Sequence, residues 1–92
     1  MQIHGSKALV TGGASGMGRH FVLSLAKAGA DVAFCDVNAD GVAAVVAEAA
    51  DLPGRVVGFE ADVSNEDSVT ALIQNAHEAM GGLNVLVNNA GI

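Results

Sequence analysis

Short apolar runs alternate along the chain with segments in which apolar residues recur every three or four positions. The runs are rich in β-branched residues and predict strands over 7–11, 31–36, 55–60 and 84–88. The segments between them have the period of amphipathic helices. Their apolar stripes contain Met17, Phe21, Val22, Leu25 and Ala26, then Val42, Val45, Val46 and Ala49, and finally Val69, Leu72, Ile73, Ala76 and Met80.

Glycines and polar residues mark the ends of these helices. Gly29 follows the first stripe and is the type of residue that ends a helix. Asn38 precedes the second stripe and is predicted to be its N-cap. Ser64 and Asp67 resemble a capping box for the third helix, with Asp standing where Glu or Gln is usual.

The resulting order is β-α-β-α-β-α-β, and no linker or internal repeat divides it. Right-handed crossovers between such strands build a parallel sheet with helices on both faces. Nearly continuous apolar strands suit a sheet that is buried on both sides. The pattern therefore predicts one α/β domain with a doubly wound parallel sheet over residues 1–92.

Charge and cysteine content restrict the possible partners and location. The formal charge is −6 with only four Lys and Arg residues, so we expect no nucleic acid and no membrane as partners, because both attract basic patches. The chain has no apolar run of membrane-spanning length and no signal-peptide pattern at its start. Cys35 is the only cysteine and cannot form an internal disulfide, which predicts a reducing, cytoplasmic location.

A glycine-rich segment, residues 11–18, lies where the first strand meets the first helix. Glycine allows the backbone to turn sharply and approach a pyrophosphate, and a helix N-terminus favours anions. The spacing of Gly12, Gly16 and Gly18 differs from G-x-G-x-x-G, and no Gly-Lys-Ser/Thr follows that would indicate a Walker loop. A plain structural turn is the alternative interpretation.

A second signal lies at the end of the second strand, where Asp36 follows Gly12 by 24 residues. A carboxylate there can accept hydrogen bonds from both hydroxyls of an adenosine ribose, and it would repel a 2′-phosphate. The alternative is a solvated aspartate at the end of a strand.

The segment Thr11-Gly12-x-x-x-Gly16-x-Gly18 resembles the TGxxxGxG motif of the short-chain dehydrogenase/reductase family. Residues 88–91 match the family's Asn-Asn-Ala-Gly motif, and Asp62-Val63 lies where the family has an aspartate against adenine. The resemblance covers essentially the whole chain and is to the N-terminal, cofactor-binding half. It implies a Rossmann-type fold and an oxidoreductase that transfers hydride between NAD(H) and an alcohol or ketone substrate.

The same resemblance implies roles for individual residues. Those expected along the pyrophosphate and the adjoining ribose are Gly12, Ser15, Gly16, Met17 and Gly18. Those expected around the adenosine are Asp36, Val37, Asp62, Val63, Asn89, Ala90 and Gly91, although the last three could also form a purely structural turn.

The preference for NAD over NADP follows from Asp36 and from two absent basic residues. NADP-preferring relatives have a basic residue in the glycine turn or just after the second strand, where this chain has Ser15 and Val37. Arg19 is nearby and is expected to point along the first turn of its helix.

The catalytic residues that the resemblance implies are a Ser, a Tyr-x-x-x-Lys pair and an Asn. The sequence contains no Tyr, and its two lysines, Lys7 and Lys27, fall in the first strand and the first helix. We therefore expect a partial, truncated domain whose C-terminal half is absent and which is inactive by itself. The parent is expected to be a homo-oligomer, either a tetramer or a dimer.

Two other function classes remain open. A non-catalytic NAD-binding module or sensor shares the cofactor motifs, and a Rossmann-like methyltransferase is a more remote alternative.

The histidines His4, His20 and His77 have no metal-ligand spacing, so no metal site is expected.

Overall fold

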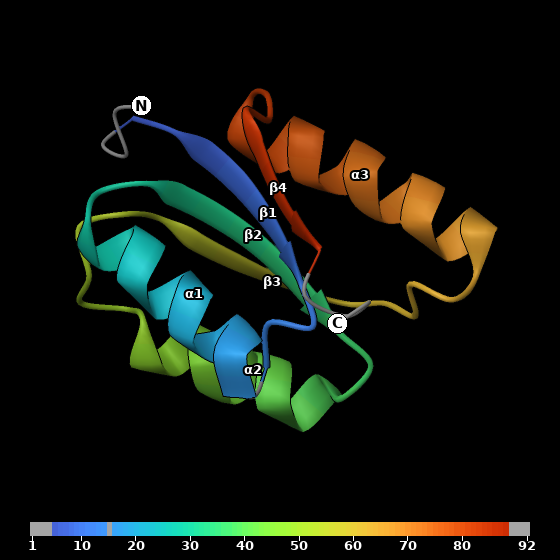
Figure 1. Cartoon of the computed structure of the whole chain (residues 1–92), viewed down its shortest axis with the longest axis horizontal. Helices are drawn as coiled ribbons and strands as arrows, with labels where there is room; N and C mark the ends of the chain where they lie inside the picture. Colours follow the sequence, from blue (N-terminus) through green and yellow to red (C-terminus); the bar gives the residue numbers. More distant parts are fainter. Residues whose placement is uncertain (1–4, 15, 89–92) are drawn as a thin grey trace.

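The computed structural model describes residues 5–14 and 16–88 (Figure 1). It contains the seven elements in the predicted order. They are β1 (Lys7–Thr11), α1 (Gly16–Lys27), β2 (Asp31–Asp36), α2 (Ala39–Glu48), β3 (Val56–Glu60), α3 (Glu66–Met80) and β4 (Val85–Asn88). Strands β1 and β2 have the predicted bounds, and β3 and β4 each begin one residue later than predicted.

The four strands form one parallel sheet in the order β3-β2-β1-β4. Helices α1 and α2 cover one face, and α3 covers the other (Figure 1). This is the predicted doubly wound arrangement. The chain moves outward from β1 to β3 and then returns across the sheet to β4, so β1 and β4 flank the point where the strand order reverses. Ligands of such sheets bind beyond the carboxyl ends of the strands, near this point.

Alternating residues of β2 supply both halves of the core. Phe34 packs with Val10 and Val22 on the face covered by α1 and α2. Cys35 points to the opposite face, where it packs with the α3 residue Leu72. Cys35 is fully buried and has no disulfide partner among the described residues, and burial raises the pKa of its thiol. It is a small residue of the core on this face.

The predicted caps are correct for α2 and wrong for α3. The Asn38 side chain accepts a hydrogen bond from the Gly41 N–H at 3.1 Å, as expected of an N-cap. The proposed capping box of Ser64 and Asp67 does not form. Asn65 is the N-cap of α3, with extended backbone and a side chain that accepts from the Ser68 N–H at 3.2 Å. Ser64 comes one residue too early to cap the helix.

The buried sides of α1 and α3 are narrower than the predicted stripes. Met17 and Ile73 were expected in the core and are 61% and 45% exposed. Each is one position from a buried residue, Gly18 or Leu72, and one position rotates a side chain by about 100° around a helix.

In the part of the chain that the structure describes, no helix has the length and apolar character needed to cross a membrane.

Candidate cofactor-binding site

A cavity of about 220 Å³ opens beyond the carboxyl ends of β1, β2 and β3. Because the strands are parallel, these ends meet at one edge of the sheet, although they are far apart in sequence. The lining residues are Gly12, Cys35, Asp36, Val37, Ala61, Asp62 and Val63. Five of them belong to the predicted cofactor site.

The glycine-rich turn is packed closely against β2. The Gly13 N–H donates to the Cys35 carbonyl at 2.9 Å. A Cβ atom at Gly13 would lie 2.7 Å from Cδ2 of the buried Phe34, too close for any larger residue without a shift of the core. Gly12 and Gly16 have φ angles of +65° and +57°, in the left-handed region that glycine adopts without strain. The turn is therefore held in place before any ligand binds.

The Asp36 carboxylate joins this turn to the start of α2. Its Oδ2 atom accepts from the Ala14 N–H at 3.1 Å, and its Oδ1 atom accepts from the Asn38 N–H at 3.2 Å. The two donors come from different segments and fix the plane of the carboxylate. Each oxygen can accept a further hydrogen bond. The geometry suits a ligand with two neighbouring hydroxyl groups.

Helix α1 begins next to this cavity. Its first turn has no acidic residue, so nothing there opposes the attraction of the helix N-terminus for an anion. Gly18 is buried, whereas Met17 is exposed. The predicted pyrophosphate residues Gly16, Met17 and Gly18 thus lie in one helical turn, adjacent to Gly12.

Asp62 forms the opposite side of the cavity, after β3. Its Oδ1 atom accepts from the backbone N–H of Ser64 at 2.9 Å and from the Ser64 hydroxyl at 2.6 Å. These hydrogen bonds hold the pKa of Asp62 below its ordinary value. Asp62 therefore stays ionised through the neutral range and acts as a hydrogen-bond acceptor.

Among the residues that the structure describes, no Lys or Arg lines the cavity. The Arg19 guanidinium forms an ion pair with Glu48 of α2, and its Nε atom donates to Oε1 at 3.0 Å. Lys7 begins β1 and Arg55 immediately precedes β3, both away from this edge, and Lys27 is in the last turn of α1. An anion held here is held by backbone N–H groups.

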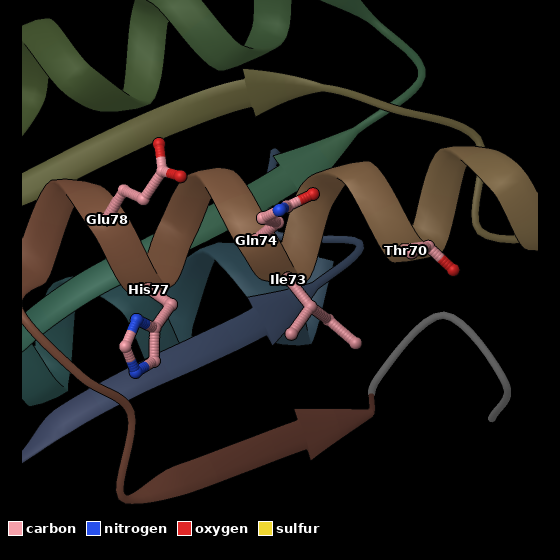
Figure 2. Close-up of a pocket in the computed structure, with 5 residues that line it drawn as sticks. All are labelled: Thr70, Ile73, Gln74, His77 and Glu78. Atoms are coloured by element: carbon pink, nitrogen blue, oxygen red, sulfur yellow. The ribbon is translucent and has the colours of Figure 1, made fainter.

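A larger surface hollow of about 580 Å³ lies along α3 (Figure 2). Gln74 and Glu78 project from one side of the helix, and Ile73 and His77 project from the other (Figure 2). His77 and Glu78 therefore do not form an acid–base pair. Residues 5–14 and 16–88 contain no group of three or more His, Cys, Asp or Glu residues that could hold a metal ion. The cavity at the sheet edge is the better candidate.

Five residues of the predicted site line this one cavity: Gly12, Asp36, Val37, Asp62 and Val63. Ser15, Asn89, Ala90 and Gly91 lie outside the described residues. Sequence reasoning missed two contributors, the Ala14 amide and Ser64. The Ala14 amide is a backbone group that nearly every residue type provides, so the sequence does not mark it. Ser64 could have been found, because an Asp side chain in a turn often accepts a hydrogen bond from the residue two positions later.

Residues 6–92 match the family model described as short chain dehydrogenase. The chain belongs to the short-chain dehydrogenase family. It is similar to a (2S)-[(R)-hydroxy(phenyl)methyl]succinyl-CoA dehydrogenase subunit of Thauera aromatica, with 40% identity over 92 residues, 100% of this chain and 37% of that protein. It is also 35% identical to the 7alpha-hydroxysteroid dehydrogenase of Escherichia coli over 91 residues, 99% of this chain and 36% of that protein.

Solved structures of short-chain dehydrogenases share the fold. A 7 alpha-hydroxysteroid dehydrogenase complexed with NADH and 7-oxo glycochenodeoxycholic acid superposes with a TM-score of 0.91 at 33% identity, over 95% of this chain and 34% of that chain. A Burkholderia phymatum enzyme in complex with NAD gives a TM-score of 0.89 at 34% identity, over 94% of this chain and 31% of that chain. The chain therefore spans about a third of the length of these relatives.

Removal of the Asp36 carboxylate should loosen the turn even without a ligand. In Asp36→Ala, the Ala14 and Asn38 amides lose their acceptor, and we expect both to exchange with solvent deuterium about tenfold faster. NMR-detected hydrogen exchange measures this directly. Asp40→Ala, which removes an exposed carboxylate from the first turn of α2, should leave both rates unchanged. Equal rates in the wild type and in Asp36→Ala would show that these hydrogen bonds do not hold the turn.

Proposed function

We propose that this chain supplies the NAD(H) site of an oxidoreductase that transfers hydride between the nicotinamide and an alcohol or ketone. The observation that supports this most strongly is the Asp36 carboxylate, fixed by two backbone amides at the edge of a cavity and retaining an acceptor position on each oxygen. An adenosine ribose offers two neighbouring hydroxyl donors to match. The bound dinucleotide supplies the hydride chemistry, and the residues described here bind and orient it.

The other contacts fit the rest of a dinucleotide. Backbone N–H groups at the exposed start of α1, at Gly16 and Met17, suit the pyrophosphate. Val37 and Val63 offer apolar surface to the adenine, and Asp62 offers it an acceptor. Ser15, Asn89, Ala90 and Gly91 complete the proposed site on the strength of the family motifs.

Charge favours NAD over NADP in this proposal. A 2′-phosphate would lie against the Asp36 carboxylate, and the described residues that line the cavity include no basic side chain to compensate. Arg19, the basic residue nearest to the glycine turn in sequence, is bound to Glu48. The relatives solved with NADH and with NAD are consistent with this choice.

Catalysis is proposed to depend on residues outside these 92. The chain has no Tyr to act as a general acid, and its two lysines lie at the amino end of β1 and the carboxyl end of α1. A non-catalytic NAD-binding module is the other candidate, but the similar proteins are named as dehydrogenases and a reductase. Those relatives act on different carbonyl and alcohol compounds, so the proposal extends to that chemical class alone. We also retain the predicted homo-oligomer and cytoplasmic location as proposals.

Replacement of Asp36 should change the choice of cofactor. In the natural protein that contains this chain, Asp36→Ala removes charge-assisted hydrogen bonds, and we expect NAD affinity to fall about ten- to a hundredfold. The affinity for NADP should rise relative to the affinity for NAD, because the carboxylate that repels the 2′-phosphate is gone. Calorimetric Kd values for both dinucleotides, with Asp40→Ala as the control, test this. An unchanged ratio of the two affinities would refute the assignment of Asp36.

The 92 residues expressed alone should not catalyse oxidation or reduction. We expect no protein-dependent change in NADH absorbance with a panel of alcohols and ketones, because no residue here can act as the tyrosine acid that the family resemblance implies. The same assay on the natural protein is the positive control. Sustained turnover by residues 1–92 would place a catalytic group within them.

A further inference from the structure

One oxygen of Asp62 is fully occupied in the structure. Oδ1 accepts both the N–H and the hydroxyl of Ser64, at 2.9 and 2.6 Å, and a carboxylate oxygen has two lone pairs. Among the described residues, no hydrogen bond to Oδ2 is formed. The carboxylate therefore has one committed oxygen and one that can accept from a ligand.

Asp62 lies where its second oxygen is available to a ligand in the cavity. Asp62 lines the cavity beyond the strand ends, with Val37 and Val63 as apolar neighbours, whereas Ser64 lies outside the lining. Apolar surface beside a single anionic acceptor suits a flat base that carries an amino group. It does not suit a base with a carbonyl oxygen at the same position, because two acceptors would face each other.

We propose that Ser64 is a positioning residue for base recognition, which engages Oδ1 of Asp62 and leaves Oδ2 to accept from the 6-amino group of adenine. This inference rests on the proposed dinucleotide site. It predicts that the site distinguishes adenine from hypoxanthine, in which an oxygen replaces the amino group. Ser64 contributes to that selectivity without touching the base.

A purely structural role for Ser64 leads to a different expectation. The turn from Asp62 to Asn65 precedes α3, and the Asp62 carbonyl also accepts from the Asn65 N–H at 3.1 Å. If Ser64 only closes this turn, its loss should lower the affinity for all dinucleotides by the same factor. If Ser64 positions Asp62, its loss should lower the affinity for the adenine dinucleotide more than the affinity for the hypoxanthine dinucleotide. The ratio of the two affinities separates the two roles.

The experiment measures calorimetric Kd values of the natural protein for NAD and for nicotinamide hypoxanthine dinucleotide. In Ser64→Ala, which keeps the backbone N–H and removes the hydroxyl, we expect the preference for NAD to fall about three- to tenfold. Ser64→Thr keeps a hydroxyl and should retain the preference. Ser24→Ala, on the exposed side of α1, is the matched control and should not change it. An unchanged preference in Ser64→Ala, or equal weakening of both dinucleotides, would overturn the inference.

A second measurement needs no dinucleotide. Because the Ser64 hydroxyl is the largest cause that lowers the pKa of Asp62, carboxyl NMR titration of Ser64→Ala should show that pKa raised toward the ordinary value of an aspartate. An unchanged pKa would show that the hydroxyl does not hold the carboxylate, and would overturn the inference alone. A wild-type protein that binds neither dinucleotide would instead overturn the proposed function, and base recognition with it.

Discussion

The half-buried carboxylate of Asp36 is the group on which the proposed cofactor site depends. It ends β2, accepts from the Ala14 amide in the glycine-rich turn, and accepts from the Asn38 amide just before α2. Asn38 in turn caps α2. A single side chain therefore ties together a strand end, a turn and a helix start. Each of its oxygens can accept a further hydrogen bond, so in the proposed function the same carboxylate holds the turn and binds the ribose hydroxyls.

The sheet order explains why the contacts meet. Parallel strands place every carboxyl end on the same edge, so residues 12, 36 and 62 line one cavity despite their separation in sequence. The chain is acidic, and the described residues that line this cavity include no Lys or Arg. The proposed recognition of an anionic dinucleotide therefore relies on backbone N–H groups at the N-terminal end of α1, where glycines keep the backbone accessible.

The fold was largely predictable because strand and helix periods are properties of local sequence. The bounds of β2 and the cap at Asn38 were predicted correctly, since an apolar run and an Asn before a helix are local signals. The cap of α3 was not, because Ser64, Asn65 and Asp67 all resemble capping residues and only backbone geometry selects Asn65. The exposure of Met17 depends on how α1 is rotated against the sheet, which is a tertiary property.

The site was predictable as a set of side chains but not as a network. Asp36 and Asp62 were identified from strand ends and family motifs, whereas the partners that orient them are backbone amides and a neighbouring hydroxyl. Such partners depend on the path of the turn. The orientation of each carboxylate, and the base selectivity proposed from it, therefore depend on the three-dimensional path of the backbone.

Amide chemical-shift mapping of the natural protein with NAD and NADP tests the central claim most directly. We expect NAD to shift the Ala14 and Asn38 amides, which donate to the Asp36 carboxylate, and NADP to require a higher concentration for the same effect. Shifts confined to the Thr70–Glu78 face of α3, or stronger binding of NADP, would contradict the account.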